Sequence, residues 1–420
     1  MNSSIKQIYV SLEISDNKLR MLVAEYFNTR FNILRVDSKK TQAISDFKVI
    51  DKEQLSKDIK ELADNISSKL GAKIEKVILV LPAYNFKRYP LRSSVVPENS
   101  VIEKTDIVRA INNSLKVNVD ADSMVVNPMI TKYTINGISS RRIPEKDTCD
   151  EMFVDIDLLC ADRQMCFEYV SCVENAGLNV LDITLNTYAI AKEASLFEES
   201  LKQNLIILDI ENTCTYLSLL SKGRMVSNEL LFDGVSTLVR QVKLKYDIPE
   251  EDISKLLKFD VDFESEHLDN IVYAYNENGK TKTISLKELN EVSLNPIDLF
   301  ADKLVTMCKP ILEQDASIFI TGEGQLIEPL VKKIKELSNV DVRSYYPDTI
   351  GVRDPELTAI YGSLFAYKDK VLLNNLNVTC IDLLQYDSYI DQKQIDSEGE
   401  TITTKIKNFF KQYVEGKGGY

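Results

Sequence analysis

The residue types that carry most enzyme chemistry are scarce or scattered in this chain of 420 residues. Its one histidine, His267, would have to serve any Ser-His-Asp or Cys-His hydrolase, and a histidine-rich metal site is excluded. The seven cysteines form no CxxC pair, and the six-residue steps between Cys160, Cys166 and Cys172 match no metal-ligand spacing. We therefore expect buried free thiols in a reducing compartment.

Two short segments about half a chain apart place an acid at the end of an apolar strand. Residues 10–17 read VSLEISDN and residues 206–213 read IILDIENT. In each segment the acid, Glu13 or Asp209, is followed by isoleucine and a polar turn. This weak internal repeat predicts a duplicated α/β domain with a cleft between its halves.

The elements around these acids follow the same order twice. Strands and helices alternate as expected of an α/β fold. The first half is predicted to contain strands over 8–14, 19–26 and 31–36, a helix over 54–70, a strand over 77–81, a helix over 165–176 and a strand over 178–183. The second half restarts with strands over 205–210, 216–220 and 225–232, then a helix opening at 248, a helix over 296–312, a strand over 317–320, and helices over 326–337 and 357–367.

Two features of this pattern concern packing. Strand-like pieces over 124–126, 132–135 and 153–160 surround one helix over 105–115, which predicts a separate small α+β domain between the repeats. Gly362 lies inside the final helix, where a small residue permits close packing against a neighbour.

The order and spacing of the motifs resemble the actin-like ATPase superfamily and, within it, the bacterial cell-division family FtsA, over about residues 5–370. The first family turn, D-I-G-T-x-K, is here Glu13-Ile14-Ser15-Asp16-Asn17-Lys18, and the second, D-I-G-G-G-T, is Asp209-Ile210-Glu211-Asn212-Thr213-Cys214. Residues 321–326, TGEGQL, resemble T-G-G-G-A-x-L. The resemblance implies duplicated actin-like (ribonuclease H-like) domains around a nucleotide cleft, with a small α+β (SHS2-like) insert.

The resemblance also implies a binding site for ATP with Mg²⁺, in which turn N–H groups cradle phosphates and strand-end acids position the metal and water. The implied phosphate-turn residues are Glu13, Ser15, Asp16, Asn17, Lys18, Asp209, Glu211, Asn212 and Thr213. The implied residues on the adenosine side are Gly234, Gly322, Glu323 and Gly324. No catalytic residue and no metal ligand of the chain itself is assigned.

Departures from the family pattern fall on the phosphate turns. Ser15 replaces a glycine of the first turn, and Glu211, Asn212 and Thr213 replace all three glycines of the second. Glycine permits the close backbone approach and positive φ that a phosphate turn uses, and a carboxylate at Glu211 would repel a triphosphate. We therefore expect an altered mode of nucleotide binding and little or no ATP turnover from a degenerate site.

Read with the family, the chain divides into five parts. They are residues 1–82 with 166–200 (first actin-like domain), 83–165 (inserted domain), 201–385 (second actin-like domain, with a small subdomain at about 240–305), 386–401 (flexible acidic linker) and 402–415 (amphipathic helix).

The terminal segment carries its own signal. Apolar residues recur at i, i+4, i+7, i+8, i+11 and i+12, which makes one stripe on a helix with lysines beside it. The predicted membrane-binding residues are Ile402, Lys405, Ile406, Phe409, Phe410, Lys411, Tyr413 and Val414. The pattern is typical of an interfacial membrane anchor, as at the end of FtsA, although the stripe could also dock on the protein's own surface or in a partner's groove.

Charge and family together define the expected partners. The net charge of −13 argues against nucleic acid, and the absence of a signal peptide or a long apolar run predicts a cytoplasmic protein. The resemblance implies an adaptor that tethers the tubulin-like FtsZ polymer to the membrane at the division site, binds the FtsZ C-terminal peptide near residues 240–305, and self-associates into filaments. Alternatives on the same fold are a PilM-like scaffold of a pilus or secretion assembly and a nucleotide-binding ATPase with another role.

Overall fold

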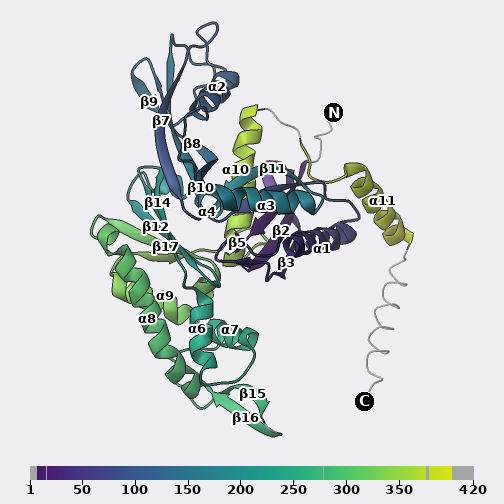
Figure 1. The fold of residues 1–420 in the computed structure, drawn as a ribbon, viewed down its shortest axis with the longest axis vertical. Coiled ribbons are helices and arrows are strands. Elements are labelled where there is room, and N and C mark those ends of the chain that lie inside the picture. Colours follow the sequence, from purple (N-terminus) through teal and green to yellow (C-terminus); the bar gives the residue numbers. More distant parts are fainter. Residues whose placement is uncertain (1–6, 16, 278, 375–377, 400–420) are drawn as a thin grey trace.

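Two five-stranded sheets with the same topology form the body of the molecule (Figure 1). The computed structural model describes residues 7–399 apart from 16, 278 and 375–377. In each sheet three antiparallel strands are extended by two parallel ones, in the orders β11-β6-β1-β2-β3 and β14-β13-β12-β17-β18. The predicted duplicated α/β fold is therefore confirmed.

The strands begin and end close to the predicted positions. The first sheet contains β1 (Gln7–Ile14), β2 (Lys18–Phe27), β3 (Arg30–Lys40), β6 (Lys76–Leu81) and β11 (Asn179–Leu185). The second contains β12 (Asn204–Ile210), β13 (Thr215–Ser221), β14 (Arg224–Leu231), β17 (Ala316–Thr321) and β18 (Val342–Ser344). Because β1 and β12 occupy equivalent places in the two sheets, Glu13 and Asp209 lie at equivalent strand ends.

The helices of the first half follow local signals. In α1 (Lys52–Leu70) the Asp51 carboxylate accepts the N–H of Gln54, and the helix ends at Gly71, whose φ of 69° suits a residue without a side chain. The other elements are β4 (Ile44–Ser45), β5 (Lys48–Val49), α3 (Arg163–Asn175), α4 (Asn186–Glu193) and α5 (Leu196–Glu199).

A separate four-stranded sheet with its own apolar core projects from the first half, at the top of Figure 1. It consists of β7 (Lys87–Val95), α2 (Lys104–Ser114), β8 (Ser123–Ile135), β9 (Ile138–Ser140) and β10 (Met152–Asp162). Strand β8 is continuous where the sequence predicts two pieces, because pairing with β10 passes across Pro128 with two register shifts nearby.

Helices cover the second sheet, and a hairpin projects at the bottom of Figure 1. They are α6 (Val235–Lys243), α7 (Glu250–Phe259), α8 (Leu286–Leu312), the 3₁₀ turn η1 (Glu323–Leu326) and α9 (Glu328–Ser338), with the hairpin β15 (Ile271–Glu277) and β16 (Lys280–Ser285). Helix α8 starts at Leu286 instead of residue 296, since Ser285 and Glu288 form a capping box and Pro296 lies inside the helix.

After the second sheet the chain leads back to the first half, where helix α10 (Thr358–Asn374) packs. After the turn η2 (Pro355–Leu357), α10 packs on α4, where a Cβ at Gly362 would lie 2.2 Å from the Ala189 carbonyl oxygen. The close packing predicted at Gly362 is confirmed. Helix α10, which the sequence assigned to the second domain as part of residues 201–385, packs its buried side chains against the first half.

The segment after α10 also differs from its prediction. Part of the predicted flexible linker, 386–401, belongs to helix α11 (Leu383–Gly399). The helix is fixed to the body at its start, because Tyr386 is buried and the Tyr389 ring covers Gly71. The predicted membrane-binding residues, from Ile402 to Val414, lie outside the described residues.

Candidate functional site

The predicted acids of the cleft meet in one place. Glu13 and Asp209 are each the last residue but one of their strand, β1 and β12, and they are only 5% and 3% exposed. Glu211 follows β12 directly, and Glu323 opens η1. Lys18, the first residue of β2, lies at the rim of the same group. The repeat therefore brings its two strand-end acids together across the cleft.

A buried arginine that the sequence analysis does not single out lies at the centre of these acids. Arg20 is directly opposite Glu13 in the β1–β2 pairing, and its side chain is 1% exposed. Its Nη1 lies 3.3 Å from Glu13 Oε2, and its Nη2 lies 2.7 Å from Glu211 Oε2 and 3.3 Å from Glu356 Oε2. Because Glu13 and Arg20 lie in the first sheet and Glu211 directly follows β12 of the second sheet, the guanidinium joins the two halves.

Two lysines extend the group. Lys18 pairs with Glu356, and Lys258 of α7 places its Nζ 2.6 Å from Glu323 Oε1 and 3.6 Å from Glu356 Oε1. We call this set the Arg20 cluster; it comprises Lys18, Arg20, Lys258, Glu13, Asp209, Glu211, Glu323 and Glu356.

Backbone geometry holds Glu356 in the cluster. It lies in η2, where the Asp354 carboxylate accepts the N–H of Glu356 at 3.0 Å. The Pro355 carbonyl accepts the N–H of Gly322 at 3.3 Å and the hydroxyl of Thr321 at 3.2 Å. The end of β17 thus fixes the turn that carries this carboxylate.

Burial and charge set the protonation of the cluster. Burial raises the pKa of Glu13 to about 7 despite Arg20, and it also raises the pKa values of Asp209 and Glu211. Burial alone would raise the pKa of Glu356 too, but Arg20 and Lys18 lower it to about 2. Five carboxyl groups thus share three cations, and Glu356 holds its negative charge most firmly.

Protein atoms occupy the space beside the glycines on the predicted adenosine side. A Cβ at Gly234 would lie 2.3 Å from the Glu211 carbonyl oxygen, and one at Gly322 would lie 2.6 Å from Asp209 Oδ1. A Cβ at Gly324 would lie 2.3 Å from Ile210 Cγ2. These glycines therefore permit close packing of the β17 turn and of α6 on the second turn.

Several backbone N–H groups of the predicted phosphate turns already donate hydrogen bonds within the protein. The N–H of Ser15 donates to the Lys18 carbonyl at 3.0 Å, and that of Glu211 donates to Cys214 at 2.9 Å. At the start of α6, the N–H groups of residues 235 and 236 donate to the carbonyls of residues 211 and 212 at 3.1 and 2.8 Å. The helix N-terminus, a common anion site, is thus satisfied within the protein.

These observations test the fit of ATP with Mg²⁺. The space enclosed by Glu13, Ser15, Asn186 and Glu211 is about 10 Å³, no more than one water molecule. Among the described residues, no group of three or more histidine, cysteine, aspartate and glutamate side chains is arranged to hold a metal ion. Carboxylates already hold the cations that a triphosphate would need, so the described residues do not fit the nucleotide in this arrangement. Asp16 lies outside them.

The remaining predicted residues lie at the turns. Asn17 accepts the N–H of Thr41 through its carbonyl at 3.0 Å, while Asn212 and Thr213 are half-buried. The seven cysteines are all buried, as predicted, and His267 is exposed. In the described part of the chain, no helix is long and apolar enough to cross a bilayer.

Sequence reasoning missed Arg20, Lys258 and Glu356. One signal was available for Arg20, since it is a lone cation inside the apolar strand run LRMLVA. Lys258 and Glu356 carry no comparable signal, because α7 and η2 meet the cleft only through the tertiary fold.

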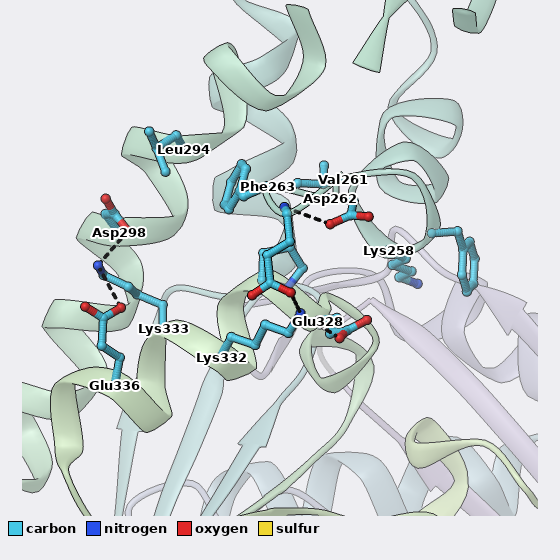
Figure 2. A pocket seen from close by; sticks show the side chains of 13 residues that line it. Lys258, Val261, Asp262, Phe263, Leu294, Asp298, Glu328, Lys332, Lys333 and Glu336 are labelled. Carbon is cyan, nitrogen blue, oxygen red and sulfur yellow. Dashed lines mark hydrogen bonds and ion pairs between the residues drawn. The ribbon is translucent and has the colours of Figure 1, made fainter. Parts of the chain in front are cut away.

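A second cavity, of about 440 Å³, lies between α8, α9 and the loop after α7 (Figure 2). Its apolar lining includes Val261, Phe263 and Leu294, of which Leu294 is 47% exposed. Ion pairs surround it: Lys332 with Glu264 and Glu328, and Lys333 with Asp298 and Glu336. Lys258 lines this cavity and also belongs to the Arg20 cluster.

Replacing Glu356 by glutamine tests the electrostatics of the cluster. The carboxyl is ionised in the folded protein down to about pH 2, against an ordinary value of 4.5, so its contribution to stability is present above pH 4.5 and disappears as the pH falls toward 2. We expect Glu356→Gln to lower the free energy of unfolding by ~3 kcal/mol at neutral pH and by much less near pH 2. Urea unfolding across this range measures the difference; a constant gap between the two proteins would contradict the assignment.

Comparison with known proteins agrees with the motifs. No family model matches the chain. It is similar to the cell division protein FtsA of Bacillus subtilis (strain 168), with 21% identity over 361 residues that span 83% of this chain and 81% of that protein. FtsA of Enterococcus faecalis (strain ATCC 700802 / V583) is 20% identical over an alignment of 435 positions, which covers 96% of this chain and 98% of that protein. These matches confirm the resemblance to FtsA, in a divergent form.

Solved structures share the fold. The PilM-PilN type IV pilus biogenesis complex matches with a TM-score of 0.57 and 12% identity, over 85% of this chain and 98% of that chain. MreB5 of Spiroplasma citri, solved bound to ADP, matches with a TM-score of 0.52 and 13% identity, over 88% and 99%. At this identity the likeness shows the fold alone, and it confirms duplicated actin-like domains.

Proposed function

We propose that this protein is an FtsA-like adaptor of cell division that tethers FtsZ polymers to the inner face of the cell membrane without turning over ATP. The observation that supports this most strongly is the resemblance to FtsA along nearly the whole length of both chains. The proposed absence of turnover is supported by the cleft, where the space enclosed by Glu13, Ser15 and Glu211 is about 10 Å³ and carboxylates already pair with Arg20.

Membrane binding in this proposal comes from the terminal stripe. A short helix with few lysines binds a bilayer weakly in one copy. Self-association into filaments would align many copies, and their effective concentration would make attachment strong. Polymerisation and membrane binding would therefore be coupled.

We place the FtsZ C-terminal peptide in the cavity of Figure 2. The loop after α7 and the cavity-lining residues of α8, Leu294 and Asp298, lie within residues 240–305, where the family implies this contact, while α9 completes the wall. Half-exposed Phe263 and Leu294 offer apolar contacts, and the surrounding ion pairs of Lys332 and Lys333 offer polar ones. Such a mixture suits an extended peptide that buries a few apolar side chains.

A charge placed in this cavity tests the assignment. Leu294→Glu should weaken binding of a synthetic FtsZ C-terminal peptide, from the same organism, at least about tenfold, because it removes apolar contact and adds a buried charge. Fluorescence anisotropy of the labelled peptide measures the affinity. Leu299→Glu is the matched control, since Leu299 lies on the same helix, is 63% exposed and does not line the cavity. Equal affinities for both variants would mean that the peptide binds outside this cavity. If the wild type does not bind the peptide, the proposed FtsZ partner is wrong.

A further inference from the structure

We propose that the cleft of this protein is closed by its own side chains: the Arg20 cluster occupies the place between the two turns where a polyphosphate would bind and joins the halves without nucleotide. This goes beyond the adaptor role, which would be the same with an open or a closed cleft.

The carboxylates of Glu211 and Glu356 bind the cations that a phosphate group would otherwise bind. Arg20 offers one guanidinium nitrogen to Glu211 at 2.7 Å and to Glu356 at 3.3 Å, and the Lys18 ammonium also holds Glu356. A guanidinium and an ammonium that converge on oxygen acceptors are the groups that bind phosphate in proteins. Here both are engaged by oxygens of the chain.

The burial of the Arg20 ion pairs strengthens their attraction, and we call these pairs the joint between the two halves. Arg20 is 1% exposed and Glu211 is 11% exposed at its side chain, so their attraction is little screened by water. The cleft also carries an exposed pair between the halves, Lys40 with Glu251, whose side chains are 71% and 68% exposed. Exposed pairs of this kind contribute little to holding surfaces together. Among the ion pairs between the halves, the buried ones therefore contribute most to holding the cleft closed.

Nucleotide binding would require this joint to break. A triphosphate placed between the turns would have to displace Glu211 and Glu356 from Arg20. The released carboxylates would stay near Glu13 and Asp209 in a buried, already acid-rich place. Gly322 and Gly324 also pack closely on residues 209 and 210, so a nucleotide would have to separate the turn after β17 from the second turn as well.

The first test measures the distance between the two halves in the full-length protein, with the Arg20 cluster left intact. Cysteines introduced at Lys57 and Lys255, which are 67% and 69% exposed on α1 and α7, carry spin labels, while the seven native thiols are buried. Pulsed electron paramagnetic resonance then measures the distance between the halves with and without millimolar ATP and Mg²⁺. We expect one narrow distribution that ATP does not shift, and no heat of binding in parallel calorimetry. A shift or a saturable heat would overturn the proposal.

The second test removes the joint. Arg20→Met should lengthen or broaden the distance distribution, Arg20→Lys should restore most of the wild-type distribution, and Lys40→Met, which breaks the exposed pair, should leave it unchanged. Glu211→Gln weakens the same contact with less disturbance and serves if Arg20→Met does not fold. A wild-type distribution in both Arg20→Met and Glu211→Gln would overturn the proposal.

Discussion

Replacement of Arg20 by methionine is expected to lower the free energy of unfolding by about 3–5 kcal/mol, the usual cost of removing one partner from a buried ionic group. Methionine fills much of the space but leaves Glu13 and Glu211 buried without their cation. Their pKa values, already raised by burial, would rise further, so the loss should grow with pH as these carboxyls are forced to ionise. Denaturant unfolding at several pH values measures both effects.

A matched arginine shows what an exposed ion pair contributes. Arg142 pairs with Asp147 at 3.0 Å, but its side chain is 75% exposed. Arg142→Met should therefore cost less than about 1 kcal/mol. Similar losses for the two variants would mean that the Arg20 cluster adds no more than a surface contact does.

Loss of two phenylalanines from the terminal stripe is expected to abolish membrane binding. Phe409→Ser/Phe410→Ser removes two large apolar side chains, each of which contributes roughly 1.5–3 kcal/mol when it leaves water. Binding to vesicles that contain anionic lipid should fall at least about a hundredfold. Co-sedimentation with vesicles over a range of lipid concentrations measures this.

The control for this variant keeps the charge and the number of substitutions. Asn408→Ser/Gln412→Ser changes two residues off the predicted apolar stripe and should bind vesicles like the wild type. Equal loss in both variants, or a wild type that stays in solution, would favour docking of the stripe on a protein surface.

Local patterns were enough to predict much of the fold. Alternating apolar runs predicted both meanders, and Leu55, Ile59 and Leu62 at helical spacing predicted α1. The repeat of acid, isoleucine and polar turn predicted that Glu13 and Asp209 end equivalent strands. These signals depend on neighbours within a few residues, which is why they can be read from the chain alone.

The predictions that differ from the structure concern elements whose position depends on residues distant in sequence. Pro296 resembles a helix start, but the capping box at Ser285 begins α8 earlier. Residues 358–367 of α10 are buried or half-buried in an unbroken run, and such a run does not show which domain the helix covers. Most of the polar segment predicted as a linker belongs to α11, which is held by the contact of Tyr389 with Gly71, far away in sequence.

The same limit applies to the candidate site. The sequence predicted that Glu211 would oppose a triphosphate, but not that Arg20 would pair with both Glu211 and Glu356. Their sequence separation is so large that only the folded cleft brings them together.

Flotation of FtsZ with vesicles tests the adaptor role most directly. Purified FtsZ from the same organism, polymerised with GTP, is mixed with vesicles and the full chain in the absence of ATP. We predict that FtsZ floats with the vesicles when the wild-type chain is present, and remains in solution without the chain or with Phe409→Ser/Phe410→Ser. If FtsZ stays in solution although the wild-type chain floats, the protein binds membranes but does not tether FtsZ, and the proposed function is wrong.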